Sequence, residues 1–388
     1  MRMASRRLAV VIGIAGVFLA GCTGSSKGPA TGSGAPSQPG PSAVVEAKPA
    51  DGARDVAPGD PVMVSAKGST LRNVGLVDEK GKPVSGELSP AGDAWTATGK
   101  LEYSTRYTMT WTSSSADGAT VTGSSTFVTA TPKALAYPSV IPLDGETTGV
   151  GIPIIIKFSQ PVKDHAAAER GLKVTSDKPA EGAWRWFGDD EVHYRTKEYW
   201  PPYNKITLDI DLGGVALGDG IYGETDRRIN FQTGPAIISK VSDKDKQLRA
   251  YKDGQLVLTA PVSLGKPTAR SVSGTLLVMT VQSPYTMDSS TYGVPADSPG
   301  GYRTTVQYAL RLTNSGQFLH SAPWSVADQG RTNVSHGCIN MSTANAKWFY
   351  ENSHRGDVVE VSDTGEQVKP GDGWTDWRFT WEQWIQGR

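Results

Sequence analysis

The sequence predicts a mainly β protein, in which two β-sandwich domains precede a third β-rich domain with a short helical extension at the C-terminus. The 388 residues are too many for one ordinary domain, and the 44 glycines and 25 prolines favour short strands joined by turns. Stretches with helical periodicity are scarce. A segment of about 100 residues, the usual size of a sandwich domain, occurs twice.

The repeated segment defines the first two domains, at 43–132 and 133–234. Each copy has a Pro/Gly-rich entry before an apolar strand and closes on a Phe-x-Thr sequence. The matching stretches are Val62-Met63-Val64 with Ile154-Ile155-Ile156, and Phe127-Val128-Thr129 with Phe231-Gln232-Thr233. Neither copy contains a cysteine, which excludes a disulfide-bridged antibody-type domain. We interpret both copies as rigid spacer domains.

The first 42 residues predict export and a tether. Arginines precede an apolar run at 8–18, which is too short to span a membrane comfortably. The sequence Leu19-Ala20-Gly21-Cys22 then resembles a bacterial lipobox, in which Cys22 would carry two acyl chains; the alternative is an ordinary signal peptide with an incidental cysteine. We therefore expect removal of 1–21, and a Gly/Ser/Pro-rich tether at 22–42 that holds an extracytoplasmic protein to the outer face of the plasma membrane.

Composition argues against nucleic-acid binding and draws attention to the thiol of Cys338. The 39 basic and 39 acidic residues give a formal net charge of zero, so no basic face for nucleic acid is indicated. The chain has two cysteines, and if Cys22 carries lipid, Cys338 has no partner for an intrachain disulfide. Such a thiol is either a buried apolar group or a reactive one.

The pattern changes near residue 235 and predicts a different β-rich domain at 235–362. Its expected elements are a hairpin turn at Asp253-Gly254, a strand at 273–281, a helix capped by Ser342 and a closing strand at 357–361. The stretch 282–304 is rich in Ser, Pro, Gly and Tyr and is long for a connection. It is either a lid over a site or a surface loop.

The C-terminal extension, 363–388, is rich in tryptophan. Spacings of three, four and three residues place Trp374, Trp377, Trp381 and Trp384 on one face of a helix. These side chains would form either a sugar-binding strip or a packing surface against a neighbouring domain, and we favour packing.

The strongest chemical signal is Ser335-His336-Gly337-Cys338-Ile339-Asn340, with His320 upstream. A thiol is a good nucleophile only as a thiolate, and a nearby imidazole favours that form. On an extended strand His336 shares a face with Cys338, while His320 is far enough away in sequence to lie on a neighbouring strand. Gly337 lets the backbone approach a substrate, and N–H groups near the nucleophile can receive an oxyanion. These residues by themselves predict cysteine-dependent acyl transfer.

A histidine, fourteen residues and then Ser-His-Gly-Cys-Ile-Asn resembles the catalytic signature of the L,D-transpeptidase (YkuD-type) family. The resemblance covers 235–388 and, more loosely, the two preceding domains, and it is strongest to actinobacterial lipoprotein members with two Ig-like domains. The lid and pocket sequences that match are Tyr292-Gly293-Val294-Pro295, Tyr302-Arg303 and His320-Ser321-Ala322-Pro323-Trp324. The chain departs from the family at Ser271-Val272-Ser273-Gly274, where many members have Thr-Pro-x-Gly, and this concerns a nearby strand connection rather than the catalytic set.

The resemblance implies a role for each matched residue. Cys338 would be the nucleophile, His320 its base, and the backbone carbonyl of Ser321 would orient the imidazole. His336 would position the site, and its backbone N–H with those of Gly337 and Cys338 would shape the oxyanion hole. The implied substrate-binding residues are Tyr302, Met287, Tyr292, Trp324, Ser335 and Asn340, the last of which would also hold the motif loop.

The reaction implied by the resemblance is the formation of 3→3 cross-links in peptidoglycan. The thiolate would attack the carbonyl between meso-diaminopimelate and the terminal D-Ala of a tetrapeptide stem, and D-Ala would leave. The side-chain amine of another stem's diaminopimelate would then resolve the thioester. The implied partners are these donor and acceptor stems, and carbapenem-type β-lactams as covalent inhibitors. No cofactor or metal is implied.

Other interpretations of the same residues stay open. A cysteine-dependent carboxypeptidase or peptidoglycan hydrolase would use water as the acceptor. His320, His336 and Cys338 could bind zinc, although no second spaced ligand pair accompanies them. The sequence from Ser263 to Lys266 matches the Ser-x-x-Lys of serine enzymes but lacks their companion motifs. A non-catalytic wall-binding scaffold, or a merely structural thiol, is the remaining alternative.

Overall fold

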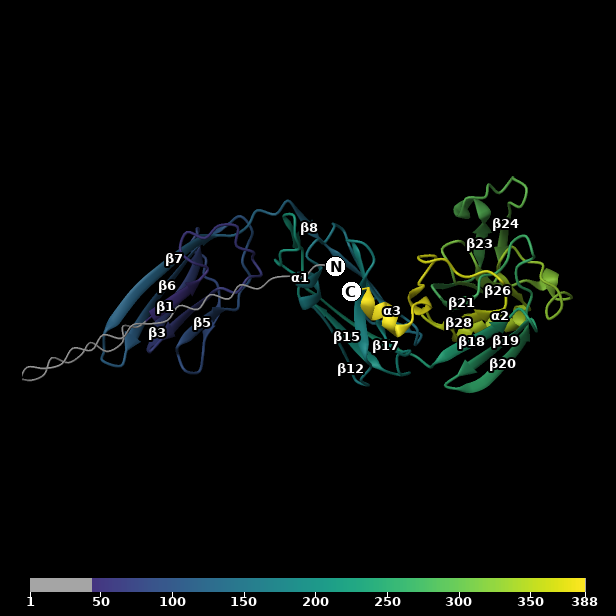
Figure 1. Ribbon diagram of the computed structural model, residues 1–388, viewed down its shortest axis with the longest axis horizontal. Helices are drawn as coiled ribbons and strands as arrows, with labels where there is room; N and C mark the ends of the chain where they lie inside the picture. The colour runs from purple at the N-terminus through teal and green to yellow at the C-terminus, as the bar shows by residue number, and fades with distance from the viewer. Residues whose placement is uncertain (1–43, 388) are drawn as a thin grey trace, which may run out of the picture. The chain divides into compact units, whose positions relative to one another are not determined.

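The computed structural model describes residues 44–387 (Figure 1), so the predictions for the export signal, Cys22 and the tether lie outside the described residues. Strands dominate the described chain, and the predicted mainly β fold class is confirmed. Within 44–387, no helix is both long enough and apolar enough to cross a lipid bilayer.

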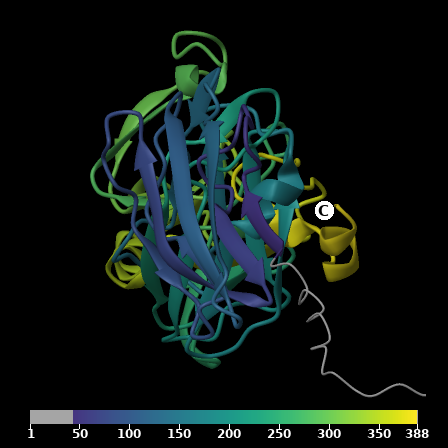
Figure 2. The same cartoon turned by 90° about the vertical axis from the view of Figure 1, so that its left-hand side faces the viewer.

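The first sandwich consists of two sheets with strand orders β1-β2-β5-β4 and β3-β6-β7. The long strands β6 and β7 run side by side (Figures 1 and 2). The bounds are β1 Val44–Lys48, β2 Met63–Lys67, β3 Ser69–Asp78, β4 Gly86–Leu88, β5 Ala94–Ala97, β6 Arg106–Ser115 and β7 Thr120–Val128. Val64, Trp95, Met109 and Phe127 pack into one core, because alternate residues of each strand point to the same face.

The second sandwich has the orders β13-β14-β11-β9 and β10-β17-β15-β12, with a small pair of β8 and β16. The bounds are β8 Ala134–Ala136, β9 Pro138–Ile141, β10 Thr147–Thr148, β11 Ile154–Phe158, α1 His165–Arg170, β12 Leu172–Ser176, β13 Gly182–Trp186, β14 Glu191–Thr196, β15 Lys205–Ile210, β16 Ile221–Gly223 and β17 Arg227–Thr233. Its core contains Ile154, Trp200, Leu208 and Phe231.

The sequence repeat has a structural counterpart at the two Phe-x-Thr sequences. The hydroxyl oxygen of Thr129 accepts a hydrogen bond from the N–H of Thr105 at 3.0 Å, and that of Thr233 accepts one from the N–H of Asn204 at 2.9 Å. Each hydroxyl also donates to a backbone carbonyl at 2.7 Å. The two sandwiches therefore close their last long strand with the same side-chain contact.

The third region carries two sheets, with the orders β20-β19-β18-β28-β21 and β22-β25-β26-β27, and a two-stranded flap of β23 and β24. The bounds are β18 Ile237–Ser242, β19 Gln247–Lys252, β20 Gln255–Pro261, β21 Gly274–Leu277, β22 Thr280–Gln282, β23 Tyr285–Asp288, η1 Ser289–Tyr292, β24 Arg303–Val306, β25 Ala309–Arg311, β26 Phe318–Ser321, η2 Pro323–Ser325, β27 Ile339–Met341, α2 Thr343–Asn352 and β28 Val358–Ser362. Leu310, Leu319, Ile339 and Phe349 share its core, which joins β25, β26, β27 and α2.

Several predicted local elements of this region are present. Asp253 and Gly254 form the β19–β20 turn with positive φ angles of 51° and 81°. Ser342 caps α2, and its hydroxyl accepts from the N–H of Asn345 at 3.3 Å. The strand predicted at 273–281 is interrupted, because β21 pairs with β28 whereas β22 pairs with β25 of the other sheet.

The C-terminal extension is not one continuous helix, so the prediction that four tryptophans share one helical face is wrong. The short helix η3 (Asp376–Arg378) ends before a second helix, α3 (Trp381–Gln386). Thr380 caps α3 through a capping box with Gln383. Because α3 begins anew at this point, the helical periodicity does not continue from Trp377 to Trp381.

The tryptophans of the extension nevertheless pack against a domain surface, as favoured above. Trp384 is fully buried, and its indole N–H donates to the carbonyl of Ala183 in the second sandwich at 2.9 Å. The guanidinium carbon of Arg195 lies 4.6 Å from the ring centre of Trp377 and 4.9 Å from that of Trp384. Packing rather than sugar binding therefore accounts for these side chains.

Candidate active site

Cys338 and His320 are brought together by two neighbouring parallel strands. β26 pairs with β27 so that His320 lies opposite Asn340, and Cys338 immediately precedes β27. Residues two apart on a strand point to the same face, so Cys338, like Asn340, lies on the face that carries His320. The 20 positions from His320 to Asn340 therefore separate two residues that are direct neighbours in the β26–β27 register.

Both side chains line one pocket of about 280 Å³. The lining residues are Met287, Tyr302, Thr304, His320, Trp324, Val334, Ser335, His336, Cys338 and Asn340. All but Thr304 and Val334 were predicted from the sequence. The β23–β24 flap contributes Met287 and Thr304, so the long stretch at 282–304 forms part of the wall of the pocket.

Three predicted site residues differ in placement from this set. Gly337 and Ser321 adjoin the pocket in sequence but do not line it. Tyr292 ends the short helix η1, and its side chain lies outside the part of the structure that is described.

The thiol of Cys338 is buried, and burial favours its protonated form. The residue is 5% exposed, and its Sγ donates to the carbonyl oxygen of Gly316 at 3.7 Å. Burial raises the pKa of Cys338 to about 12, and a hydrogen bond from the backbone of Phe318 offsets only part of that rise. Attack by this sulfur would need a base to take its proton.

His320 lines the same pocket, with one of its two ring nitrogens engaged by the backbone. Its Nδ1 lies 2.8 Å from the carbonyl oxygen of Ser321; because a carbonyl only accepts, Nδ1 carries the proton and Nε2 carries the lone pair. Burial lowers the pKa of His320, and the hydrogen bonds to Ser321 and to the Asn340 side chain counter part of this effect. Burial thus favours the uncharged form of both side chains of this pocket.

The motif loop, residues 335–338, is held by two serine hydroxyls. Ser335 donates to the carbonyl oxygen of Cys338 at 2.6 Å and accepts from the N–H of Gly337 at 3.1 Å. Ser271, which the sequence analysis did not assign to the site, donates to the carbonyl oxygen of Gly337 at 2.7 Å. Gly337 has a φ of 116°, a conformation that strongly favours glycine.

Asn340 ties β27 to the segments beside it. Its N–H donates to the carbonyl of Ser263 at 2.9 Å, and the N–H of Ser263 donates back at 3.0 Å. Its side-chain amide donates to the hydroxyl of Ser325 at 3.3 Å. Asn340 thus fixes the strand that follows the motif loop, while Ser335 and Ser271 hold the loop itself.

In the Ser-x-x-Lys match, Ser263 and Lys266 make separate contacts that the sequence did not predict. Ser263 is fully buried, and its hydroxyl donates to the carbonyl of Thr332 at 2.7 Å. Lys266 reaches the site instead, with Nζ 2.9 Å from Nε2 of His336. No local pattern in the sequence pairs these two residues, which are 70 positions apart.

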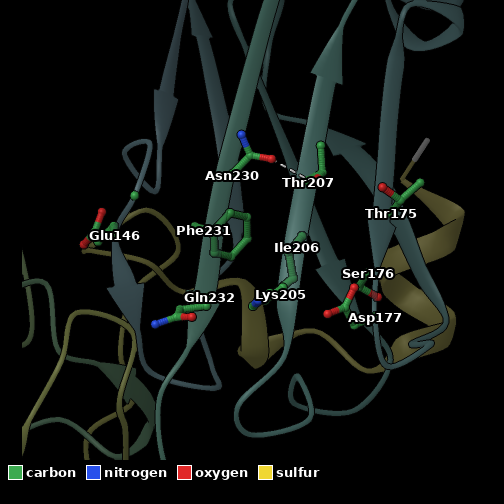
Figure 3. Close-up of a pocket in the computed structure, with 11 residues that line it drawn as sticks. Glu146, Thr175, Ser176, Asp177, Lys205, Ile206, Thr207, Asn230, Phe231 and Gln232 are labelled. Atoms are coloured by element: carbon green, nitrogen blue, oxygen red, sulfur yellow. Dashed lines mark hydrogen bonds between the residues drawn. The ribbon is translucent and has the colours of Figure 1, made fainter.

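The second sandwich bears a separate hollow of about 520 Å³ on the face of sheet β10-β17-β15-β12 (Figure 3). Its labelled side chains are mostly polar, and Asn230 and Thr207 are joined by a hydrogen bond of 3.0 Å. It shares no lining residue with the pocket at Cys338. Across residues 44–387, no group of three or more His, Cys, Asp or Glu side chains is placed to hold a metal ion.

A buried thiol and an imidazole line one pocket, on a β-rich domain that follows two sandwiches in the chain, and this combination is typical of proteins of the cysteine-dependent transferase class. The family model of the L,D-transpeptidase catalytic domain matches residues 237–361, and that of the bacterial Ig domain matches 53–216. The chain belongs to the L,D-transpeptidase family, as its resemblance to that signature predicted.

Relatives match over most of the chain. L,D-transpeptidase 2 of Mycobacterium tuberculosis (strain CDC 1551 / Oshkosh) is 42% identical over 338 residues, which cover 87% of this chain and 83% of the relative. L,D-transpeptidase 5 of Mycobacterium tuberculosis (strain ATCC 25618 / H37Rv) is 34% identical, over 90% of this chain and 77% of the relative. A solved L,D-transpeptidase in complex with imipenem is 35% identical, with a TM-score of 0.51, and the match covers 59% of this chain and 100% of that one.

Proposed function

We propose that this L,D-transpeptidase joins the diaminopimelate residues of two stem peptides in 3→3 cross-links, through a thioester at Cys338 and with release of D-Ala. The observation that carries the proposal is the buried thiol of Cys338 in one pocket with His320, whose Nδ1 is fixed and whose Nε2 keeps its lone pair. Membership of the family supports peptidoglycan cross-linking in general terms.

The first half-reaction forms the thioester. Nε2 of His320 takes the proton from Sγ of Cys338 as the sulfur attacks the carbonyl between diaminopimelate and D-Ala. The tetrahedral intermediate collapses when the C–N bond to D-Ala breaks. The departing amine receives the proton from His320, so D-Ala leaves as a neutral amine and the imidazole is neutral again.

The second half-reaction transfers the acyl group. The side-chain amine of a second diaminopimelate attacks the thioester, and Nε2 of His320 accepts a proton from that amine. The C–S bond breaks, and the proton returns to the sulfur of Cys338. The raised pKa of the thiol suits this step, because it makes the sulfur retain its proton once the product has formed.

The oxyanion requires backbone donors beside the sulfur. The N–H of Gly337 already donates to Ser335, whereas the structure gives no hydrogen bond from the backbone N–H of His336 or of Cys338 to any described residue. We assign the oxyanion hole to these two groups. Their orientation is set by the serine contacts that hold the loop.

The walls of the pocket place apolar and aromatic side chains around the polar groups of the reacting centre. Met287 is 2% exposed, and the rings of Tyr302 and Trp324 lie near the two imidazoles, at 5.5 Å from His336 and 6.0 Å from His320 respectively. With a stem bound, the flap residues would exclude water and favour an amine as the acceptor. A β-lactam offers the same thiol a strained acyl group, and a solved relative in complex with imipenem supports inhibition of this kind.

The place of action is part of the proposal. Cys22 would carry the lipid that anchors the chain to the outer face of the plasma membrane, and the tether would let the catalytic region reach the wall. Export of the chain with a Cys22→Ala substitution should release it from the membrane fraction.

The test is incubation of the protein with a disaccharide-tetrapeptide, followed by mass spectrometry. We expect a cross-linked dimer with loss of D-Ala, and fragmentation of the dimer should place the new bond between two diaminopimelate residues. Cys338→Ala should give neither the dimer nor the loss of D-Ala, with an unchanged thermal unfolding midpoint as the check on its fold. Tripeptide without dimer would instead identify a carboxypeptidase. No turnover by the folded wild type would leave a non-catalytic wall-binding scaffold.

A further inference from the structure

Lys266 is tied to the motif loop by its backbone and by its side chain. Its N–H donates to the carbonyl of Ser335 at 3.0 Å, and the N–H of Ser335 donates to the carbonyl of Leu264 at 3.1 Å. Its Nζ lies 2.9 Å from Nε2 of His336, which lines the pocket with Cys338. The ammonium group is therefore held beside the reaction pocket, in a contact that stays accessible to solvent.

The contact fixes the chemical form of His336. An ammonium group has donors and no acceptor, so Nε2 of His336 must accept, and the ring is neutral with its proton on Nδ1. Charging the ring would place a second positive charge at hydrogen-bond distance from Lys266. Desolvation and the charge of Lys266 both lower the pKa of His336.

The two histidines of the pocket thus present different groups. In His320, the Nδ1–H is used by the Ser321 carbonyl, which leaves the lone pair of Nε2 as a base. In His336, the lone pair of Nε2 is used by Lys266, which leaves an uncharged N–H donor. The other titratable groups at this pocket are the phenol of Tyr302, whose ring lies 5.5 Å from that of His336, and the thiol of Cys338.

We propose that Lys266 is a positioning residue for the transfer reaction, which keeps His336 neutral with its proton on Nδ1 and so reserves the role of base for His320. The inference rests on the proposed function, since it assigns different roles to the imidazoles of His320 and His336 in that reaction. Without Lys266, Nε2 of His336 would be released and the ring would charge at a higher pH. An imidazolium there would carry an N–H on both ring nitrogens and would add a positive charge beside Cys338.

The direct test uses nuclear magnetic resonance of the whole chain with isotope-labelled histidine, and His336→Gln assigns the signals. In the wild type, long-range proton–nitrogen correlations should show the His336 proton on Nδ1 at neutral pH. Lys266→Met should raise the pH at which His336 titrates, whereas Lys266→Arg, which keeps the charge and the donors, should not. Lys347→Met, at an exposed lysine on α2, is the matched control and should leave the titration unchanged.

The kinetic test is the pH profile of kcat/KM for cross-linking. In Lys266→Met the acid limb of the profile should move to higher pH while activity at high pH is largely retained, whereas a merely structural role would lower activity equally at every pH. A proton on Nε2 of His336 in the wild type, or an unchanged acid limb in Lys266→Met, would overturn the inference. The resonance measurement needs no substrate, so a failure of transpeptidation itself would be recognised separately.

Discussion

Nδ1 of His193 lies 2.6 Å from Oδ1 of Asp376, and this contact joins the second sandwich to the C-terminal extension across 183 positions of sequence. Both residues are buried, at 7% and 2% exposure, and Nε2 of His193 contacts Glu191 at 2.9 Å on its other side. Burial by itself would lower the pKa of His193, but the carboxylates of Asp376 and Glu191 outweigh it and raise that pKa to about 9.

The first prediction concerns stability against pH. Because the pKa of His193 is raised from 6.5 to about 9 on folding, its contribution is fully present below pH 6.5 and is lost as pH rises through 9. The Asp376→Asn variant should be destabilised by about 3 kcal/mol near pH 6 and by much less above pH 9. The measurement is the urea midpoint of wild type and variant as a function of pH. Glu382→Gln, at an exposed acid of the same extension, is the control; an equal deficit for Asp376→Asn at both pH values would contradict the prediction.

The second prediction concerns the resting state of the nucleophile. Because burial raises the pKa of Cys338 to about 12, alkylation of the free protein by iodoacetamide should be slow at neutral pH and should rise with pH without a plateau near 7. His320→Gln should change this alkylation little but lower the rate of cross-linking by about 10²–10⁴-fold, because it removes the base at the moment of attack. A plateau near neutral pH in the wild type that disappears in His320→Gln would instead indicate a preformed thiolate–imidazolium pair.

The third prediction concerns Ser321 and Ser335, whose relative importance for activity the sequence did not indicate. Ser321 orients His320 through its backbone carbonyl, so Ser321→Ala should keep cross-linking within about threefold and lose about 1 kcal/mol from the hydroxyl contact with Thr343. Ser335→Ala removes both side-chain contacts within the motif loop and should lower kcat/KM by at least about tenfold. Steady-state kinetics on both variants, with unfolding midpoints alongside, make the comparison; equal losses of activity would show that the loop is not held by Ser335.

The fourth prediction concerns the glycine of the motif. An alanine at 337 would require a φ near 116°, and its Cβ would lie 3.3 Å from the side chain of Gln317. Gly337→Ala should therefore cost about 1–3 kcal/mol and displace the neighbouring nucleophile, with a loss of roughly 100-fold in kcat/KM. Gly371→Ala has a positive φ of 75° in open space, so it should lose about 1 kcal/mol and keep its activity. Comparable activity in the two variants would argue against a special backbone at 337.

Much of the site could be predicted because its main residues lie within one short stretch of the chain, from His320 to Asn340. Cys338 precedes a strand by one residue and His320 lies on the adjacent strand, so strand alternation and the motif spacing place both on one face. The β19–β20 hairpin and the cap of α2 also follow from short-range chemistry, at Asp253-Gly254 and at Ser342. Strand 273–281 could not be predicted as two pieces, because its break depends on which sheet each half joins.

The sequence by itself determined the mainly β class, through composition and strand-and-turn patterns. It also determined the family, and with it the pairing of Cys338 with His320, through the resemblance of its motif to the family signature. Tertiary structure alone decided the contacts between Lys266 and His336 and between His193 and Asp376, as well as the packing of the C-terminal tryptophans. Those partners lie 70 and 183 positions apart and share no periodic pattern. Each pair meets only after distant segments of the chain have packed together, and burial then strengthens the contact between His193 and Asp376.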